Sequence, residues 1–195
     1  MGYAAGMKSR RLLLACLLAV ACSQQSNAGS TPVVLAVDRP ETQSTGAFTL
    51  TSADFRANGE LPDRFSAYDV NSSPSLVWSG LPAGTKSLAL LLEDPDASSG
   101  KPFVHWLVAN IDPGAGGLSE GSVTLGARVG RNTRGDPAYF GPKPGGHDPH
   151  HYHFEMFALD RQLEFKVPPS RDQLLAAMSG HVLAKADLVG LYTHH

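Results

Sequence analysis

The sequence predicts a mainly β protein built as an antiparallel sandwich. Short apolar or alternating segments recur along its 195 residues, and turns rich in glycine and proline separate them. The chain contains 20 Gly and 14 Pro, which are the residues that such turns need. Helical signals occur only near the C-terminus, and no segment of the sequence is repeated.

Six segments are predicted to be strands. The segment at 87–93 is almost continuously apolar from Leu88 to Leu92, which predicts a buried central strand, although periodicity alone does not exclude a helix. The others alternate in polarity or lie between turns such as Asn58-Gly59. In chain order, the six segments are 48–52, 76–79, 87–93, 103–111, 150–159 and 188–192.

Two short helices are predicted before the last strand. Ser170 and Gln173 form a capping box ahead of the apolar residues Leu174–Met178. Gly180 is placed to end this helix. Residues 181–187 are predicted to form the second short helix.

The N-terminal segment 1–21 has the pattern of a secretory signal peptide. Basic residues in Lys8–Arg11 precede the apolar run Leu12–Ala21, which is too short to span a bilayer core of about 30 Å. Cys22 follows, and this junction resembles the lipobox of bacterial lipoproteins, in which the cysteine becomes the lipidated N-terminus. The resemblance departs at Ala19, where leucine is usual, so cleavage and release without lipid is the alternative. Met7 is an alternative start.

Residues 22–46 are expected to form a lipidated cysteine and a flexible tether, followed by one domain at 47–195. The tether prediction rests on the abundance of Ser, Gln, Asn, Thr and Pro after Cys22. The apolar run Val33–Val37 interrupts it and is either an edge strand or linker. Cleavage before Cys22 would remove Cys16, so no disulfide could form within the chain.

The mature chain is expected to be acidic. The segment 1–21 carries three of the 16 basic residues and none of the 18 acidic ones, which leaves a formal net charge of −5. An acidic body argues against nucleic acid or an anionic membrane surface as a partner. A site for an anion would have to be local.

The segment Gly141–Tyr152 is the first candidate for a functional site. It combines three glycines, three prolines and three histidines, and it leads directly into a predicted strand. With a side-chain period of two, His150 and Tyr152 share the apolar face of that strand with Phe154 and Met156. A histidine and a tyrosine beside a glycine loop predict a small polar pocket on an apolar floor.

Two further elements could complete this pocket. Asp94-Pro-Asp96 follows the predicted central strand, and its proline restricts the backbone between the two carboxylates. His105 alternates with Phe103 and Leu107, which predicts that the three side chains share one face. Without further information, His150 could equally be a hydrogen-bonded core histidine, and Asp-Pro-Asp could be only a turn.

These elements, in this order, resemble the phosphatidylethanolamine-binding protein family, and most closely its bacterial Raf kinase inhibitor-like branch. The similarity covers about residues 48–192, and includes the Asp-Pro-Asp loop, the His105-Trp106 strand, and Gly-Pro-x-Pro before His150-x-Tyr152. The segments at residues 73–87 and 184–192 also resemble the family. The resemblance implies a sandwich of two antiparallel sheets with a pocket at one end that holds phosphate, acetate or a phosphorylated headgroup.

The resemblance also implies which residues bind the ligand. They are Asp94, His105, Gly141, Pro142, His150 and Tyr152, with Asp96 orienting the loop. The chain departs from the family at Ser98, where proline is usual, and at His151, where arginine is usual. By alternation His151 points away from the pocket, so the second departure should change the surface and remove one cation near the mouth.

The sequence therefore predicts a non-enzymatic binding module in the bacterial cell envelope, lipid-anchored on the periplasmic side or secreted. It is expected to bind a small anion or a phosphorylated or phospholipid headgroup, without a cofactor, and to regulate a partner protein. A homodimer is compatible with this branch. The alternative is a weak hydrolase or a phospholipid carrier that uses the same pocket. A serine within about 3 Å of a pocket histidine would favour the hydrolase, and a deep apolar tunnel would favour the carrier.

A metal site is the remaining alternative for the histidines. By alternation His151 and His153 share the outward face and could chelate an ion weakly. Zinc sites need three or four ligands with supporting hydrogen bonds, so we expect no metal.

Overall fold

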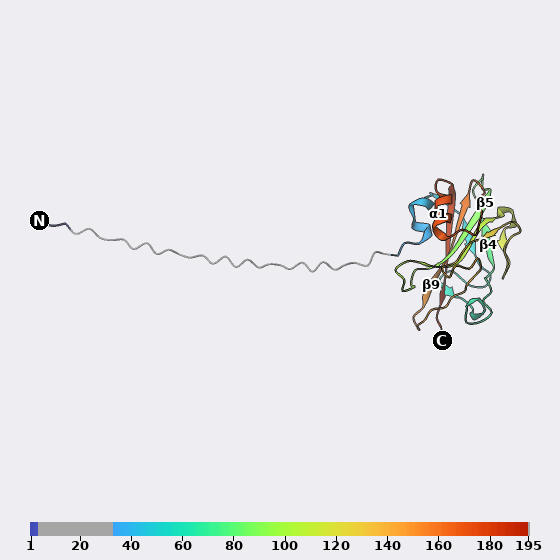
Figure 1. Cartoon of the computed structure of the whole chain (residues 1–195), viewed down its shortest axis with the longest axis horizontal. Coiled ribbons are helices and arrows are strands. Elements are labelled where there is room, and N and C mark those ends of the chain that lie inside the picture. Colours follow the sequence, from blue (N-terminus) through green and yellow to red (C-terminus); the bar gives the residue numbers. More distant parts are fainter. Residues whose placement is uncertain (4–32, 195) are drawn as a thin grey trace. The chain divides into compact units, whose positions relative to one another are not determined.

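The computed structural model describes residues 1–3 and 33–194 (Figure 1). The chain divides into two units, Met1–Ser30 and Thr31–His195. Most of the predicted signal peptide (4–21), Cys22 and the first part of the predicted tether lie outside the described residues. Within the described ranges, no helix combines the length and the apolar character that crossing a membrane requires.

The domain is mainly β. Its described strands are β1 (Gly46–Ala47), β2 (Thr49–Thr51), β3 (Gly59–Glu60), β4 (Leu76–Ser79), β5 (Ser87–Asp94), β6 (Phe103–Ile111), β7 (Gly117–Leu118), β8 (Arg128–Val129), β9 (His150–Leu159) and β10 (Val182–Tyr192). The described helices are α1 (Arg171–Met178) and four 3-10 turns, η1 (Ala36–Asp38), η2 (Pro40–Thr42), η3 (Asp63–Phe65) and η4 (Pro113–Ala115).

These strands form two sheets, as predicted. The larger has the order β1-β10-β9-β5-β6-β8, with β3 also paired to β10, and the smaller has the order β2-β4-β7. All pairings are antiparallel except those of β1 and β3, which run parallel to β10. The prediction of antiparallel sheets therefore holds everywhere among the described strands except at this one edge.

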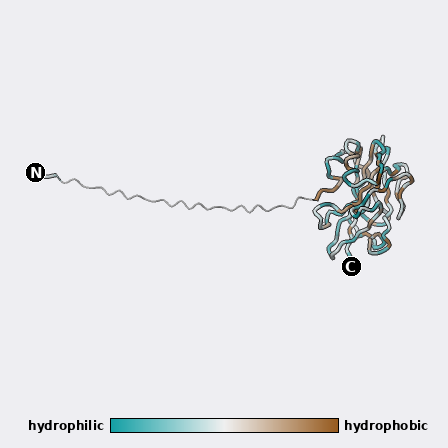
Figure 2. Tube along the Cα trace, viewed as in Figure 1, coloured by the Kyte–Doolittle hydropathy of each residue, from teal (hydrophilic) through white to brown (hydrophobic). Residues whose placement is uncertain are grey.

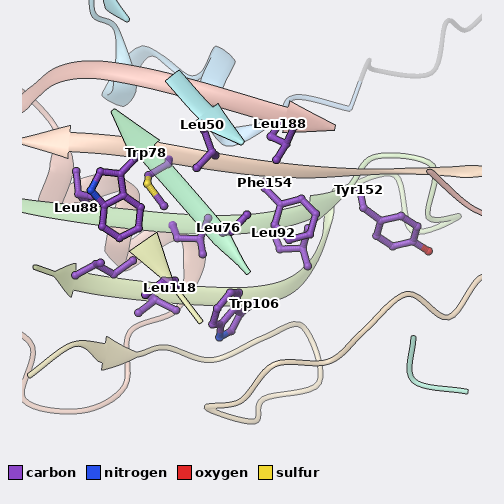
Figure 3. Packing of buried hydrophobic residues seen from close by; sticks show 14 of the residues in the cluster. Leu50, Leu76, Trp78, Leu88, Leu92, Trp106, Leu118, Tyr152, Phe154 and Leu188 are labelled. Carbon is purple, nitrogen blue, oxygen red and sulfur yellow. The ribbon is translucent and has the colours of Figure 1, made fainter. Parts of the chain in front are cut away.

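The apolar run of β5 is explained by its position at the centre of the larger sheet. Every residue of β5 is buried, because both faces of the sheet are covered. One face packs against the smaller sheet through side chains such as Leu50, Trp78 and Leu92 (Figure 3). The other packs against α1 and η1, and the apolar residues gather in the interior of the domain (Figure 2).

Helix α1 begins at the predicted capping box. The Ser170 hydroxyl accepts a hydrogen bond from the Gln173 N–H, and the Gln173 side chain accepts one from the Ser170 N–H. The buried face of the helix is formed by Leu174, Leu175 and Met178. Gly180 follows with a φ of 79°, a conformation that favours glycine.

The prediction of a second helix at 181–187 is wrong. Val182–Tyr192 is one continuous strand that pairs with β9 along most of its length. Helix-forming residues such as Lys185 and Ala186 lie in its first half. Their local preference is overridden because β9 offers a complete row of backbone partners.

The predicted tether does not extend to Gly46, because residues 33–42 pack on the outer face of the larger sheet. We call this segment the strap. The N–H of Ala36 donates to Glu93 at 3.0 Å, and the N–H of Val37 donates to Glu155 at 2.7 Å. Both glutamates are fully buried. Val33–Val37 is therefore neither an edge strand nor free linker, since two of its N–H groups donate to buried carboxyl groups.

Candidate ligand-binding site

The candidate site lies where three strand ends meet. In the antiparallel sheet, the C-terminal end of β5 lies between the N-terminal ends of β6 and β9, so that Asp94 pairs with Phe103 and Glu93 pairs with His153. A cavity of about 320 Å³ opens at this edge. Its wall is formed by Asp94, Ala97, Ser98, Phe103, His105, Arg134, Phe140, Lys143, Pro144, Gly145 and His150.

Asp94 fixes the orientation of His150. The Nδ1–H of His150 donates to Asp94 Oδ2 at 2.8 Å, and the Asp96 N–H donates to Asp94 Oδ1 at 2.8 Å. The Asp94 side chain is 5% exposed and the His150 side chain 20%. With its proton held on Nδ1 by the carboxylate, the His150 ring leaves Nε2 for a ligand.

His105 occupies a β-bulge. Leu92 pairs with Trp106 while the next residue, Glu93, pairs with Val104, so His105 is the extra residue in β6. The bulge shifts the alternation of the strand. His105 and Phe103 line the cavity with ring centroids 4.6 Å apart, whereas Leu107 packs on the opposite face of the sheet. The prediction that Leu107 shares a face with His105 is therefore wrong.

The His105 ring is neutral at physiological pH. Its Nδ1–H donates to the carbonyl oxygens of Phe140 and Gly141, at 2.7 and 3.1 Å. Burial lowers its pKa from 6.5 to about 4. Its Nε2 is therefore an acceptor, and lies 4.0 Å from Asp94 Oδ2. Two acceptors thus lie side by side in the wall of the cavity.

Gly141 holds the cavity loop against the segment 65–71. Its N–H donates to Asn71 Oδ1 at 2.7 Å, and the carbonyl of Pro142 accepts from the Ala67 N–H at 3.0 Å. A Cβ at Gly141 would lie 2.0 Å from the carbonyl oxygen of Phe65, which leaves room only for glycine. Because the Gly141 N–H donates to Asn71, it is not available as a donor to a ligand in the cavity. Gly141 and Pro142 shape the loop instead of lining the cavity.

Tyr152 lies beneath the two histidines. Its ring packs edge-on against His105 with centroids 5.2 Å apart and stacks near His150 at 6.4 Å. The residue is completely buried, and its hydroxyl has no hydrogen-bond partner among residues 33–194. Burial next to Asp94 raises the pKa of this hydroxyl, so it is a neutral donor. In Figure 3 it lies at one end of the labelled core residues, with its oxygen directed away from Phe154.

Asp96 lies outside the cavity. Its Oδ2 accepts from both the backbone N–H and the ring Nδ1 of His151, each at 2.8 Å. These bonds hold the pKa of Asp96 below its usual value against the opposing effect of burial. Asp96 therefore ties the loop after β5 to the outer face of β9, where His151 points, as its alternation predicts.

The cations of the site were not predicted by any motif. Arg134 comes from an irregular, glycine-containing segment, and its guanidinium lies 4.7 Å over the ring of Phe140. Lys143 is the variable residue of Gly-Pro-Lys-Pro, and its ammonium lies 5.3 Å over the ring of Tyr68. Both side chains belong to exposed residues in the cavity wall. The only sequence signal was the position of Lys143 inside the predicted loop.

The hydrolase alternative has little geometric support. Ser98 lines the cavity, but within residues 33–194 no serine hydroxyl forms a hydrogen bond with the ring of His105 or His150.

The metal alternative concerned the histidines of the loop and of β9 that lie outside the cavity. His153 contacts Asp187 at 2.9 Å, and the described residues contain no group of three or more potential metal ligands.

We expect a Gly141→Ala substitution to destabilise the domain by about 1–3 kcal/mol, the range of an overpacked core position. The new methyl group would displace the loop from Phe65 and break the Asn71 contact. Urea unfolding of the parent and the variant measures this effect. Gly145→Ala is the matched control, because a Cβ there meets nothing within 4 Å. Equal stabilities for the two variants would contradict the packing described for Gly141.

The sequence matches the family described as phosphatidylethanolamine-binding protein over residues 51–193. It is 41% identical to the UPF0098 protein of Methanothermobacter thermautotrophicus over 143 residues, which cover 71% of this chain and 93% of the relative. It is 36% identical over 145 residues to a candidate lipoprotein of Mycobacterium tuberculosis, LppC, covering 74% of this chain and 71% of that protein.

A solved structure shows the same fold. The crystal structure of Escherichia coli YbcL, described as a member of the mammalian PEBP family, superposes with a TM-score of 0.72. The two sequences are 30% identical, and the match covers 77% of this chain and all of YbcL.

Proposed function

Because the chain belongs to the phosphatidylethanolamine-binding protein family, we propose that it binds a small phosphorylated molecule in the cavity beside Asp94, His105 and His150. The observation that carries this proposal is the distribution of charge around the cavity. Arg134 and Lys143 supply positive charge from the exposed wall, while Asp94 Oδ2 and His105 Nε2 are acceptors in the buried wall.

This arrangement suits a ligand that is both an anion and a hydrogen-bond donor. A bare anion would be repelled by the Asp94 carboxylate. A hydrogen phosphate or an ethanolamine ammonium group can donate to Asp94 and His105, while the phosphate oxygens meet the two cations. Phosphoethanolamine offers both features, and a phosphate monoester in its protonated form offers them in part.

The size of the cavity favours a headgroup over a lipid chain. A volume of about 320 Å³ lies at the lower end of the range of about 300–1,000 Å³ for small-molecule pockets. Among the described residues, Phe103 and Phe140 are the only large apolar side chains that line it. We therefore favour a binding module over a phospholipid carrier.

We further propose that the protein acts at the cell envelope, anchored through a lipid on Cys22. Support comes from the signal pattern at 1–21 and from the similarity to the candidate lipoprotein LppC. In this setting the bound headgroup would regulate a partner protein of the envelope. Detection of a lipid-modified N-terminal peptide by mass spectrometry tests the anchor, and an unmodified Cys22 in membrane-free protein would contradict it.

A calorimetric titration tests the proposed ligand class. Inorganic phosphate, phosphoserine and phosphoethanolamine are titrated into the purified chain at pH 7. We expect saturable binding of all three, with phosphoethanolamine tightest because it alone combines an ammonium donor with a phosphate and no carboxylate. Absence of binding at millimolar concentrations of all three would contradict the proposal.

Arg134→Gln is expected to weaken phosphate binding about 10-fold, since a hydrogen bond to a charged group contributes about 1.5–3 kcal/mol and this one is partly exposed to solvent. The same titration measures the loss. Arg131→Gln is the matched control, because Arg131 belongs to the same turn but does not line this cavity. Equal effects of the two substitutions would show only a general electrostatic attraction.

A further inference from the structure

A second and larger cavity lies beside the first. Its volume is about 720 Å³, and most of its wall is apolar. It is bounded by the strap, by the loop before β6, by the turn 131–135 and by the start of α1. One loop borders both cavities. Its residues Ala97 and Ser98 line the first cavity, whereas those from Ser99 to Lys101 line the second.

Positive charge dominates the wall of this second cavity. Among the described residues, four basic side chains line it and Asp172 is the only acidic one. Two of the four are already engaged by carboxylates: Arg171 pairs with Glu93, and Arg39 pairs with Glu41. The side chains of Lys101 and Arg131 have no hydrogen-bond or ion-pair partner among residues 33–194.

Arg131 is presented by a hydrogen-bonded turn. The buried side chain of Asn132 accepts from the N–H groups of Arg134 and Asp136 and donates to the Ala138 carbonyl. The Arg131 N–H donates to the Pro169 carbonyl at 2.7 Å. The backbone of Arg131 is therefore held in place in the wall, while its side chain has no hydrogen-bond or ion-pair partner among the described residues.

The apolar part of the wall comes from the strap and from β6. Val34 is one of the exposed large apolar side chains of the domain, at 38% exposure, and it lies at this cavity. Val104, near the start of β6, is largely buried and also lines the cavity. An apolar surface with unpaired cations is complementary to a molecule that has an apolar body and one acidic group.

We propose that this second cavity binds a small amphiphilic anion, with its acidic group between Lys101 and Arg131 and its apolar body between Val34 and Val104. The site is separate from the proposed phosphate site, and both can be occupied together. Carboxylate and phosphate amphiphiles share the required chemistry. The strap forms one wall, so the site depends on its docking.

Titration with octanoate tests this proposal, in a buffer that contains enough inorganic phosphate to saturate the first cavity. We expect saturable octanoate binding, with octan-1-ol at least 10-fold weaker because it has the same chain without the charge. Octyl phosphate should compete with octanoate. Octanoate and octan-1-ol binding with equal affinity would overturn the proposal, as would no octanoate binding.

Substitutions locate the site. Lys101→Gln and Arg131→Gln are each expected to weaken octanoate binding about 5-fold, while Arg134→Gln leaves it unchanged. Both substituted side chains are exposed and unpaired, so the melting temperature should stay the same as in the parent. An amide NMR map should show octanoate-induced shifts at 99–104 and 131–135. Shifts elsewhere, or no effect of either substitution, would overturn the assignment. Phosphate binding is measured separately, so the two proposals can fail independently.

Discussion

Replacing Glu93 with glutamine is expected to destabilise the domain by about 3 kcal/mol or more, the scale for removing one partner of a buried ion pair. Glu93 is fully buried and accepts from Arg171 Nε at 2.6 Å, from Arg171 Nη2 at 3.1 Å and from the Ala36 N–H at 3.0 Å. Glutamine would place an amide donor against the guanidinium and leave its charge without a counter-charge. Urea unfolding at pH 7 measures the change.

Glu155→Gln is the matched control, because Glu155 is equally buried but differently charged. Burial and the neighbouring Glu93 raise the pKa of Glu155 well above its usual value. Its Oε1 accepts from the Val37 N–H, and its Oε2 has no hydrogen-bond partner in the described part of the chain. Glutamine resembles the protonated acid, so this substitution should leave the free energy of unfolding nearly unchanged at pH 5.

The two variants also differ in their pH dependence. A raised pKa means that the folded state retains a proton which the unfolded state releases above about pH 4.5. Glu155 therefore reduces the stability of the parent as the pH rises above about 4.5, and this contribution is missing in Glu155→Gln. Its stability relative to the parent should increase with pH, by at most about 1.4 kcal/mol per pH unit. If Glu155→Gln were as destabilising as Glu93→Gln at both pH values, the assigned charges would be wrong.

The second large effect is the loss of stability that His105 causes in acid. Its pKa is lowered from 6.5 to about 4, so the unfolded chain binds a proton between these pH values and the folded chain does not. The contribution is complete above pH 6.5 and is lost as the pH falls towards 4. The difference corresponds to about 3 kcal/mol.

His105→Asn isolates this contribution. Asparagine can still donate to the Phe140 carbonyl but does not titrate, so the variant should lose less stability than the parent between pH 7 and pH 4.5. Comparing the two proteins cancels the acidic groups that both contain. We expect the difference in free energy of unfolding between the parent and His105→Asn to narrow by about 2–3 kcal/mol as the pH falls from 7 to 4.5. A constant gap would contradict a neutral, buried His105.

Much of the fold could be predicted because local signals agreed with the tertiary structure. Turns on both sides of the apolar run at 87–93 identified β5 as the central strand, and the Ser170 capping box located α1. The first half of β10 was missed because Lys185–Asp187 favours a helix locally, whereas pairing with β9 decides the outcome. No local signal reports the availability of a partner strand.

The strap could not be predicted because its contacts are made by backbone N–H groups. Ala36 and Val37 satisfy Glu93 and Glu155 through their amides, and any residue except proline could supply these donors. The sequence shows only a polar segment with a short apolar run. The strap is needed because two glutamates are buried in the larger sheet and require hydrogen-bond donors, which the strap supplies.

The candidate site was predicted in part. Asp94, His105 and His150 lie together in the cavity wall, and Tyr152 lies beneath them. Asp96 faces outward, and Gly141 supports the loop from behind. The bulge at His105 depends on strand register, and Arg134 is positioned by the turn around Asn132. Both depend on distant backbone contacts, which a motif does not encode.

The most direct test of the central claim compares phosphoethanolamine binding in three proteins: the parent, His150→Ala and His151→Ala. The two histidines are neighbours in β9, but only His150 lines the cavity, while His151 faces outward and contacts Asp96. We expect His150→Ala to weaken binding at least 10-fold and His151→Ala to leave it unchanged, with both variants folded. Equal affinities for the parent and His150→Ala would show that this cavity does not bind the ligand.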